Sequence, residues 1–336
     1  MPASLSPRTL VALTVAFIAA VFVFAGVYTA TQHKPTPSHV RVGVVGHETL
    51  LKLQGALSLP PLKSSYFEMT EYKSTADLNT AIKDRKIYAG FYNQGNGAVL
   101  IVARASGKLL ADNLVTTATD LLAKLNIPLT VKDVVPLGKN DTSGLSSYTY
   151  QYGLLVPGFV FGVLIFMFAA GLSLPWRLGL IGGYAIGAGI VGALTVDQLI
   201  GALPGHFLAV AGLGALYSAM AALVTFGLAK LMGYAGLALA GLVLILVGNS
   251  TGGGSVNQEF LPDSFRWLGQ ALPNGAFIRT VRDTVYFHGH NTSQSLMVVS
   301  VWALGGLLLI LAADPVRALV MRPFQAKKPA AKPTKK

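Results

Sequence analysis

GNSTGGGSVNQEFLPDSFRWLGQALPNGAFIRTVRDTVYFHG, residues 248–289, lies between two apolar runs at 232–248 and 295–313. Each run is long enough to be a membrane-spanning helix. The stretch between them keeps Phe and Trp side chains among its charged residues, a composition typical of a membrane interface. After Pro273, apolar residues recur at helical spacing, which predicts a short helix. We therefore predict that residues 249–294 form a re-entrant or interfacial segment and not a plain solvent loop.

The composition indicates an integral membrane protein. Of its 336 residues, 52% are hydrophobic and only 12% are charged, whereas a soluble domain has about 25% charged residues. The chain contains no cysteine, so disulfides, thiolate metal sites and cysteine nucleophiles are excluded. We expect a multi-pass protein of the cell membrane.

The positive charge has a topological explanation. The net charge is +12, which by itself could indicate nucleic acid, but the last twenty residues hold seven Lys or Arg and no acidic residue. A basic tail beside a membrane helix is typical of a cytoplasmic end that contacts anionic lipid. We therefore expect no nucleic-acid partner, and assign residues 316–336 to a basic cytoplasmic tail.

Six apolar runs predict six membrane-spanning helices, at about 10–30, 152–172, 178–196, 206–229, 232–248 and 295–313. A cleaved signal peptide is the alternative for the first run, but its apolar core is long and no clean A-x-A site follows. Arg8, Arg177, Lys230 and the tail fall on one side if the N-terminus is cytoplasmic. The positive-inside rule then places both termini in the cytoplasm and residues 35–149 outside.

Residues 35–149 change character and predict a water-soluble α/β domain. Strands are expected at 40–45, 66–72, 87–92, 98–103 and 129–135, and helices at 48–58, 74–85 and 107–125. The fold class is thus an α-helical polytopic membrane protein with an inserted extracytoplasmic α/β domain. Its parts are a first transmembrane helix (1–34), the domain (35–149), a five-helix transmembrane domain (150–315) and the tail.

The run FLPDSFRWLGQALPNGAFIRTVRD, followed by an aromatic residue and a glycine, resembles the last extracytoplasmic segment of ABC-2-type membrane permeases. It is most similar to the branch that includes phage-infection-protein-like membrane proteins. In that family a Leu-Pro pair precedes a short helix that carries an arginine and ends in glycine, a pattern that Leu272, Pro273, Arg279, Arg282 and Gly289 fit. The segments AIKDRKIYAGFYNQGNGAVLIVARASGKLLADNL and DVVPLGKNDTSGL resemble the family's external domain and its exit.

The resemblance implies the permease subunit of an exporter, energised by a separate ATP-binding-cassette subunit. The chain itself has no ATPase motif, and no membrane run has an ionisable residue near its middle, which disfavours ion-coupled transport. The connections on the cytoplasmic side are short, so an ATPase contact would involve Trp176, Arg177, Lys230 and the tail. No catalytic, metal-binding or cofactor-binding motif is present, and we expect no enzyme activity in this chain.

The stretch 248–289 supplies the candidate residues of a translocation path or gate. These are Glu259, Trp267, Leu272, Pro273, Arg279, Arg282 and Asp283. The two arginines would pair with an acidic neighbour, with lipid headgroups or with an anionic group of a substrate. Alternatively, they extend to the headgroup layer as interfacial anchors.

Small residues in the third helix predict close helix packing. Gly179, Gly183 and Gly187 are spaced four apart, and Gly189 and Ala193 form a second row. The first row fits either packing within one subunit or a homodimer face.

Two functions remain open. The first is an exporter subunit for a hydrophobic or amphipathic substrate. The second is a non-transporting scaffold or surface receptor whose external domain binds an envelope or phage partner.

Overall fold

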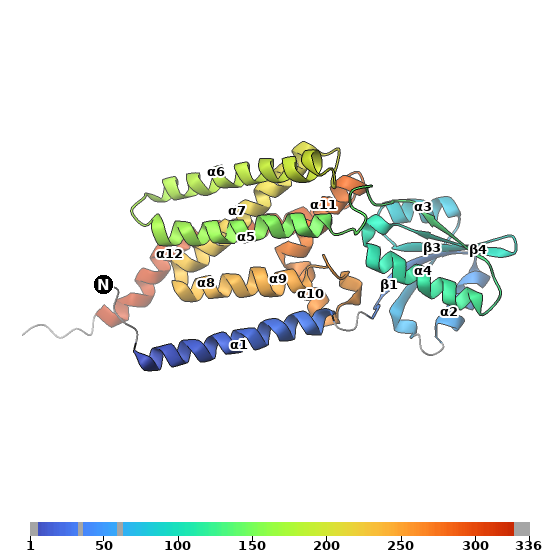
Figure 1. The fold of residues 1–336 in the computed structure, drawn as a ribbon, viewed down its shortest axis with the longest axis horizontal. Helices are drawn as coiled ribbons and strands as arrows, with labels where there is room; N and C mark the ends of the chain where they lie inside the picture. The colour runs from blue at the N-terminus through green and yellow to red at the C-terminus, as the bar shows by residue number, and fades with distance from the viewer. Residues whose placement is uncertain (1–5, 33–35, 59–62, 326–336) are drawn as a thin grey trace, which may run out of the picture.

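The computed structural model describes residues 6–32, 36–58 and 63–325. Most of the chain is helical, and a small mixed sheet lies at one end of a helical bundle (Figure 1). The sheet and its helices α2–α4 are called the α/β lobe below. The chain between α9 and α12, residues 252–291, is called the junction segment because it lies where the lobe meets the bundle.

Five helices are long and apolar enough to cross a membrane. They comprise α5 (Ser146–Phe168), α6 (Leu174–Ala193) with its π-helical extension to Leu199, α7 (Phe207–Met232), the segment Tyr234–Thr251 that contains α8 and α9, and α12 (Thr292–Gln325). Five of the six predicted apolar runs are thereby confirmed as helices of spanning length. The first run lies in α1 (Pro7–Gln32), whose described apolar part is the shorter Ile18–Thr31. The last residues of the predicted basic tail, 326–336, lie outside the described chain.

Helix α7 is the centre of the bundle. Half of its apolar window is buried, compared with 22% for α6, and α5, α6, α8 and α12 all pack against it. Helix α1 lies along the edge of the bundle (Figure 1). There Asn249 Nδ2 donates a hydrogen bond to the Tyr28 hydroxyl at 2.9 Å.

The glycines of α6 divide into two faces with different surroundings. Gly179, Gly183 and Gly187 are exposed, with no atom within 4 Å of the position that a Cβ would occupy. Packing within one subunit, one of the two explanations for this row, is therefore wrong for these three residues. Gly189 makes the close approach to α7, where an added Cβ would lie 2.5 Å from the Ala215 amide nitrogen. The second small-residue row thus packs the bundle, and the first row stays free.

The α/β lobe has the element order predicted from the sequence. Its strands are β1 (Val40–Val45), β2 (Phe67–Tyr72), β3 (Ala89–Gln94), β4 (Gly97–Val102) and β5 (Leu129–Asp133). Its helices are α2 (His47–Leu57), α3 (Thr75–Lys83), which the Ser74 hydroxyl caps, and α4 (Lys108–Ala123). The sheet order is β2-β1-β3-β4-β5, and only β3 and β4 run antiparallel. The amino ends of β1, β2 and β3 therefore share one edge, which faces the bundle (Figure 1).

The junction segment completes the cores of the lobe. Phe260 packs in the cluster formed by β1, β3, β4 and α4, and Phe287 packs in the cluster formed by α3 and the other face of the sheet. Both rings are buried, with 3% and 2% of their surface exposed. The lobe is thus held on both faces of its sheet by aromatic residues that come from far along the chain.

The junction segment itself is compact. It contains α10 (Asp263–Ala271) and α11 (Pro273–Tyr286), and α11 packs on α12, α7 and α5. The Phe277 ring stacks on Tyr217 of α7 with the ring centroids 4.3 Å apart. The glycines Gly252 and Gly254 lie in close contact with neighbouring chain. An added Cβ at Gly252 would lie 3.0 Å from the Gly248 carbonyl oxygen, and one at Gly254 would clash with Tyr148.

Candidate functional site

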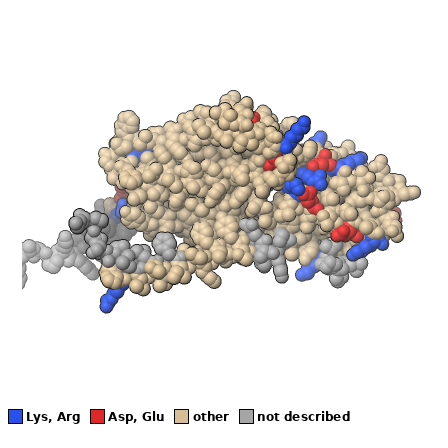
Figure 2. All heavy atoms as spheres, viewed as in Figure 1, with Lys and Arg blue, Asp and Glu red and all other residues tan. Residues whose placement is uncertain are grey.

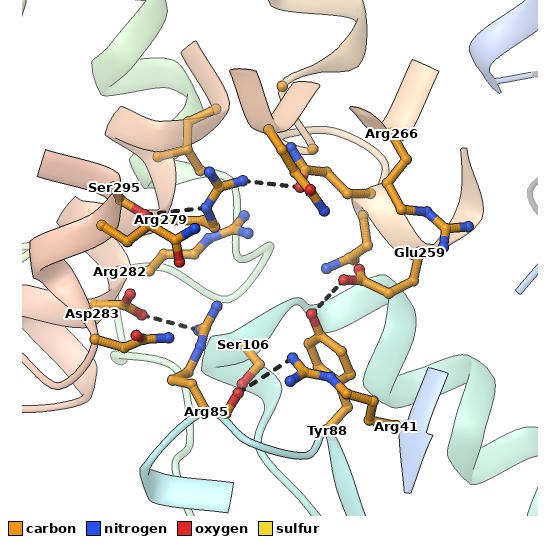
Figure 3. Close-up of a pocket in the computed structure, with 18 of the residues that line it drawn as sticks. Arg41, Arg85, Tyr88, Ser106, Glu259, Arg266, Arg279, Arg282, Asp283 and Ser295 are labelled. Atoms are coloured by element: carbon orange, nitrogen blue, oxygen red, sulfur yellow. Dashed lines mark hydrogen bonds and ion pairs between the residues drawn. The ribbon is translucent and has the colours of Figure 1, made fainter. Parts of the chain in front are cut away.

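A cavity of about 430 Å³ lies between the α/β lobe and the bundle. The lobe contributes residues at the amino ends of β1–β3, and the bundle contributes α10, α11, the first turns of α12 and the chain before α10 (Figure 3). Open α/β sheets usually bind ligands at the carboxyl ends of their strands. This cavity lies instead at the amino ends of the strands. It is formed where the lobe packs on the junction segment.

Arginine dominates the lining, and we call this site the arginine cavity. Its charged residues are Arg41, Arg85, Arg266, Arg279 and Arg282, with Glu68, Glu259 and Asp283. The five arginines exceed the three carboxylates by two positive charges. Charged side chains gather over the lobe and its junction with the bundle, whereas this face of the bundle is nearly free of them (Figure 2). The arginine cavity is therefore a polar, cationic site that lies next to an apolar bundle.

Arg279 is held by neutral partners. Its Nη1 donates to Gln258 Oε1 at 2.9 Å, and its Nε donates to Ser295 Oγ at 3.3 Å (Figure 3). Burial lowers the pKa of Arg279, and the nearby Tyr88, Asp283 and Glu259 oppose this shift. The side chain remains a cation at neutral pH because an ordinary arginine titrates far above it.

Arg282 is even more deeply buried, with 6% of its surface exposed. Its Nη2 donates to the carbonyl oxygens of Gly144 at 3.2 Å and Gly254 at 3.5 Å, which ties α11 to the chain on both sides. Burial, with repulsion from Arg85, lowers its pKa to about 10. Within the described part of the chain, neither Arg279 nor Arg282 has a carboxylate within ion-pair distance, 4.0 Å.

Arg85 crosses from the lobe to the bundle. It follows α3 with a positive φ of 62°, and its guanidinium lies 4.7 Å from the centre of the Phe287 ring. Its Nη1 lies 3.3 Å from Asp283 Oδ1 of α11. Burial raises the pKa of Asp283, although the three arginines around it favour the ionised form. Arg41 Nη2 in turn donates to the Arg85 carbonyl oxygen at 3.4 Å.

A second polar contact links the lobe to the chain before α10. The Tyr88 hydroxyl, just before β3, donates a short hydrogen bond to Glu259 Oε1. Burial and the charge of Glu259 raise the pKa of Tyr88, so the phenol remains protonated and keeps donating. Beside it, Ser38 donates its backbone N–H to the Glu259 carbonyl oxygen at 2.8 Å.

Two donors on residues that line the cavity, Gln258 Nε2 and Arg266 Nε, are buried and have no hydrogen-bond partner among the described residues. Arg85 Nη1 and Asp283 Oδ1 make no hydrogen bond of good geometry either, but they lie 3.3 Å apart as an ion pair. Buried donors are nearly always paired in native proteins. The described residues around the cavity thus leave two N–H donors without a partner.

These positions decide between two interpretations of Arg279 and Arg282. Interfacial anchors extend their charged ends into the headgroup layer and stay exposed. Arg282 is instead buried and Arg279 is partly buried, and both line the cavity beneath the lobe. The anchor interpretation is therefore wrong, and the expected pairing with Asp283 or Glu259 is replaced by bonds to neutral groups.

The other five candidates of a gate divide into three groups. Glu259 and Asp283 line the cavity, so four of the seven predicted residues come together. Leu272 and Pro273 are buried at the start of α11 and set its position, because the proline occupies the first turn where its missing N–H costs nothing. Trp267 is 68% exposed on α10 and does not line the cavity.

The predicted ATPase contacts lie at the other end of the bundle, where α5 joins α6 and where α7 ends (Figure 1). Trp176 is 69% exposed. Arg177 instead bonds to the carbonyl oxygens of Leu172 and Ala170 and closes the end of α5. Lys230 pairs with Asp314 at 2.7 Å, with only 12% of its side chain exposed.

Sequence reasoning missed the contribution of the lobe. Arg41, Arg85, Tyr88 and Ser106 join residues far along the chain, and no local pattern marks them. Arg266 and Gln258 could have been found, because they lie in the same short stretch of sequence as Glu259. Among the described residues, no three His, Asp or Glu side chains lie together as metal ligands would. Compared with known proteins, the sequence matches no family model and no curated protein.

Proposed function

We propose that the chain is the membrane-spanning permease subunit of an ABC-2-type exporter for an amphipathic substrate. The observation that carries the proposal is the arginine cavity, which lies at the head of the bundle beneath the lobe. Its wall combines buried arginines with the apolar Ile278 and Val298. Such a wall suits a molecule with a polar head and an apolar body.

In this proposal α1 is a sixth span, and the lobe is an extracytoplasmic domain. The charges support that orientation, because the α5–α6 connection and the ends of α7 and α12 lie together, away from the lobe (Figure 1). Arg177, Lys230 and Arg317 are at that end. Since the chain has no cysteine, single cysteines test the orientation directly. In intact cells an impermeant maleimide should label Ser58→Cys in the lobe and spare Ser173→Cys; the reverse pattern would overturn it.

The energy would come from a separate ATP-binding-cassette subunit. The spans offer no carboxylate near their middle for ion coupling. Because Arg177 and Lys230 already bond within the chain, Trp176 and the α5–α6 turn become the main candidate contact. The exposed Gly179–Gly183–Gly187 face of α6 is available for a second copy of the chain.

The experiment is purification of the tagged protein at its native level, followed by identification of the subunits that remain bound. We expect an ATPase subunit in the complex, and loss of that subunit on Trp176→Ala. Trp267→Ala is the matched control, because it removes an equally exposed tryptophan from the opposite end. A complex that holds an envelope protein and no ATPase would instead support the receptor or scaffold alternative.

A further inference from the structure

The arginine cavity contains positive charge that the protein does not neutralise. Arg282 is buried, Arg279 is partly buried, and both are bonded only to neutral oxygens. A buried cation is usually paired with an anion, because removing it from water is costly. The two arginines lie on the same side of α11, one turn apart, and both line the cavity.

The unpaired donors point to the same kind of ligand. Gln258 Nε2 and Arg266 Nε, on two residues that line the cavity, have no hydrogen-bond partner within the described chain, and Arg85 lines the cavity from the lobe with its Nη1 beside Asp283. Gln258 has 9% of its surface exposed, and the Arg85 side chain has 10%. Figure 3 shows Arg85, Arg266 and Arg279 around the same space. Convergent N–H groups of this kind fit an oxyanion, and guanidinium groups bind phosphate through two parallel hydrogen bonds.

We infer that the arginine cavity binds a phosphate-like anionic group, with Arg279 as the principal ligand and Arg85, Arg266 and Gln258 as further donors. Arg282 supplies charge and fixes α11. Asp283 competes with the anion for Arg85, since it lies 3.3 Å from that guanidinium. This inference specifies the head group of the substrate in the proposed function. It rests on that proposal only for the apolar body of the ligand.

The same chemistry is found in a phospholipid head and in a free anion, so the test uses both. The purified full chain, in a neutral detergent, is titrated with inorganic phosphate, with dihexanoyl phosphatidate and with dihexanoyl phosphatidylcholine. Thermal unfolding, followed by tryptophan fluorescence, reports binding because a ligand of the folded state raises the midpoint. We expect phosphate or phosphatidate to raise it and phosphatidylcholine, whose head carries a balancing cation, to have a smaller effect. A much stronger effect of phosphatidate than of phosphate identifies an amphipathic ligand, and equal effects identify a free anion.

Three variants make the test specific to the site. Arg279→Gln should weaken binding about tenfold or more, the loss expected for one charge-assisted contact. Lys124→Gln removes a charge from an exposed position of the lobe, outside the cavity, and should bind as the wild type does. Asp283→Asn removes the competitor and should bind several-fold more tightly, so it tests the site without removing an arginine.

Failure of the inference is distinct from failure of the proposed function. Absence of stabilisation by both phosphate and phosphatidate would overturn the site, whether or not an ATPase co-purifies. Equal binding by the wild type, Arg279→Gln and Asp283→Asn would also overturn it. Binding that follows the predicted order supports the site even if no ATPase is found.

Discussion

Arg85 of the α/β lobe and Asp283 of α11 face each other across the arginine cavity, with Nη1 and Oδ1 3.3 Å apart. Only 10% and 3% of the two side chains are exposed. Replacing one partner leaves the other buried without compensation, which typically costs about 3–5 kcal/mol. We therefore expect Arg85→Gln to lower the free energy of unfolding strongly. The double variant Arg85→Gln/Asp283→Asn should recover part of the loss, because neither charge is then left alone.

Chemical unfolding of the wild type, both single variants and the double variant gives the coupling energy of the pair. A coupling above about 0.5 kcal/mol supports the contact. Additive effects of the two single substitutions would show that the lobe is not held to α11 by this pair.

The pH dependence of stability follows from Asp283. Burial raises its pKa above the ordinary value, so over the interval between the two values the folded protein holds a proton that the unfolded chain has released. Stability must therefore rise as the pH falls through the folded-state pKa and must level off below the ordinary carboxyl value. As the pH is lowered through the acidic range, the unfolding midpoint of the wild type should rise relative to that of Asp283→Asn. A difference that is constant with pH, or that moves the other way, would contradict the raised pKa.

Phe260 tests whether the junction segment completes the lobe. Its ring is 3% exposed within the core cluster of β1, β3, β4 and α4. Phe260→Ala should cost about 3–5 kcal/mol, as for other buried rings. Phe168→Ala is the control, because that ring is 75% exposed and a surface substitution changes stability by about 0.5 kcal/mol or less. Equal stability of the two variants would mean that the lobe folds without the junction segment.

This dependence shows why sequence reasoning succeeded for elements and failed for their assembly. The strands and helices of the lobe follow from local patterns, such as the Ser74 cap before α3 and the glycine-containing turn that joins β3 and β4. The docking of Phe260 and Phe287 depends on contacts across most of the chain. No local pattern distinguishes a phenylalanine that enters a distant core from one that lies at a membrane interface.

For the same reason, only part of the site could be predicted from the sequence. Arg279, Arg282 and Asp283 were found because they lie together on one short amphipathic helix. Arg85 and Tyr88 were not, because their role arises only when the amino edge of the sheet meets the junction segment. The glycine prediction is confirmed for the second row, where Gly189 packs closely on α7, whereas the first row has open space within the chain.

The two glycine faces of α6 give opposite expectations for the same substitution. Gly189→Leu would drive a side chain into α7, where an added Cβ already lies 2.5 Å from the Ala215 nitrogen. It should destabilise the monomer, since overpacking typically costs about 1–3 kcal/mol and can cost more. Gly183→Leu has open space within the chain, so the monomer should fold normally. If the exposed face joins two copies, as we propose, Gly183→Leu abolishes the dimer in size-exclusion chromatography with light scattering. A dimer that persists would place the interface elsewhere.

The electrostatic potential inside the arginine cavity tests most directly whether the lobe and the bundle enclose a cationic site. Ser106 lines the cavity with 5% of its surface exposed, and Ser58 is exposed in the lobe away from it. In this cysteine-free chain, Ser106→Cys and Ser58→Cys can each be reacted with a negatively and a positively charged methanethiosulfonate of similar size. An excess of two positive charges should make the negative reagent several-fold faster at position 106, relative to the ratio at position 58 and most clearly at low salt. A positive reagent that reacts faster at position 106, or a cysteine there that reacts with neither reagent, would contradict the enclosed cationic site.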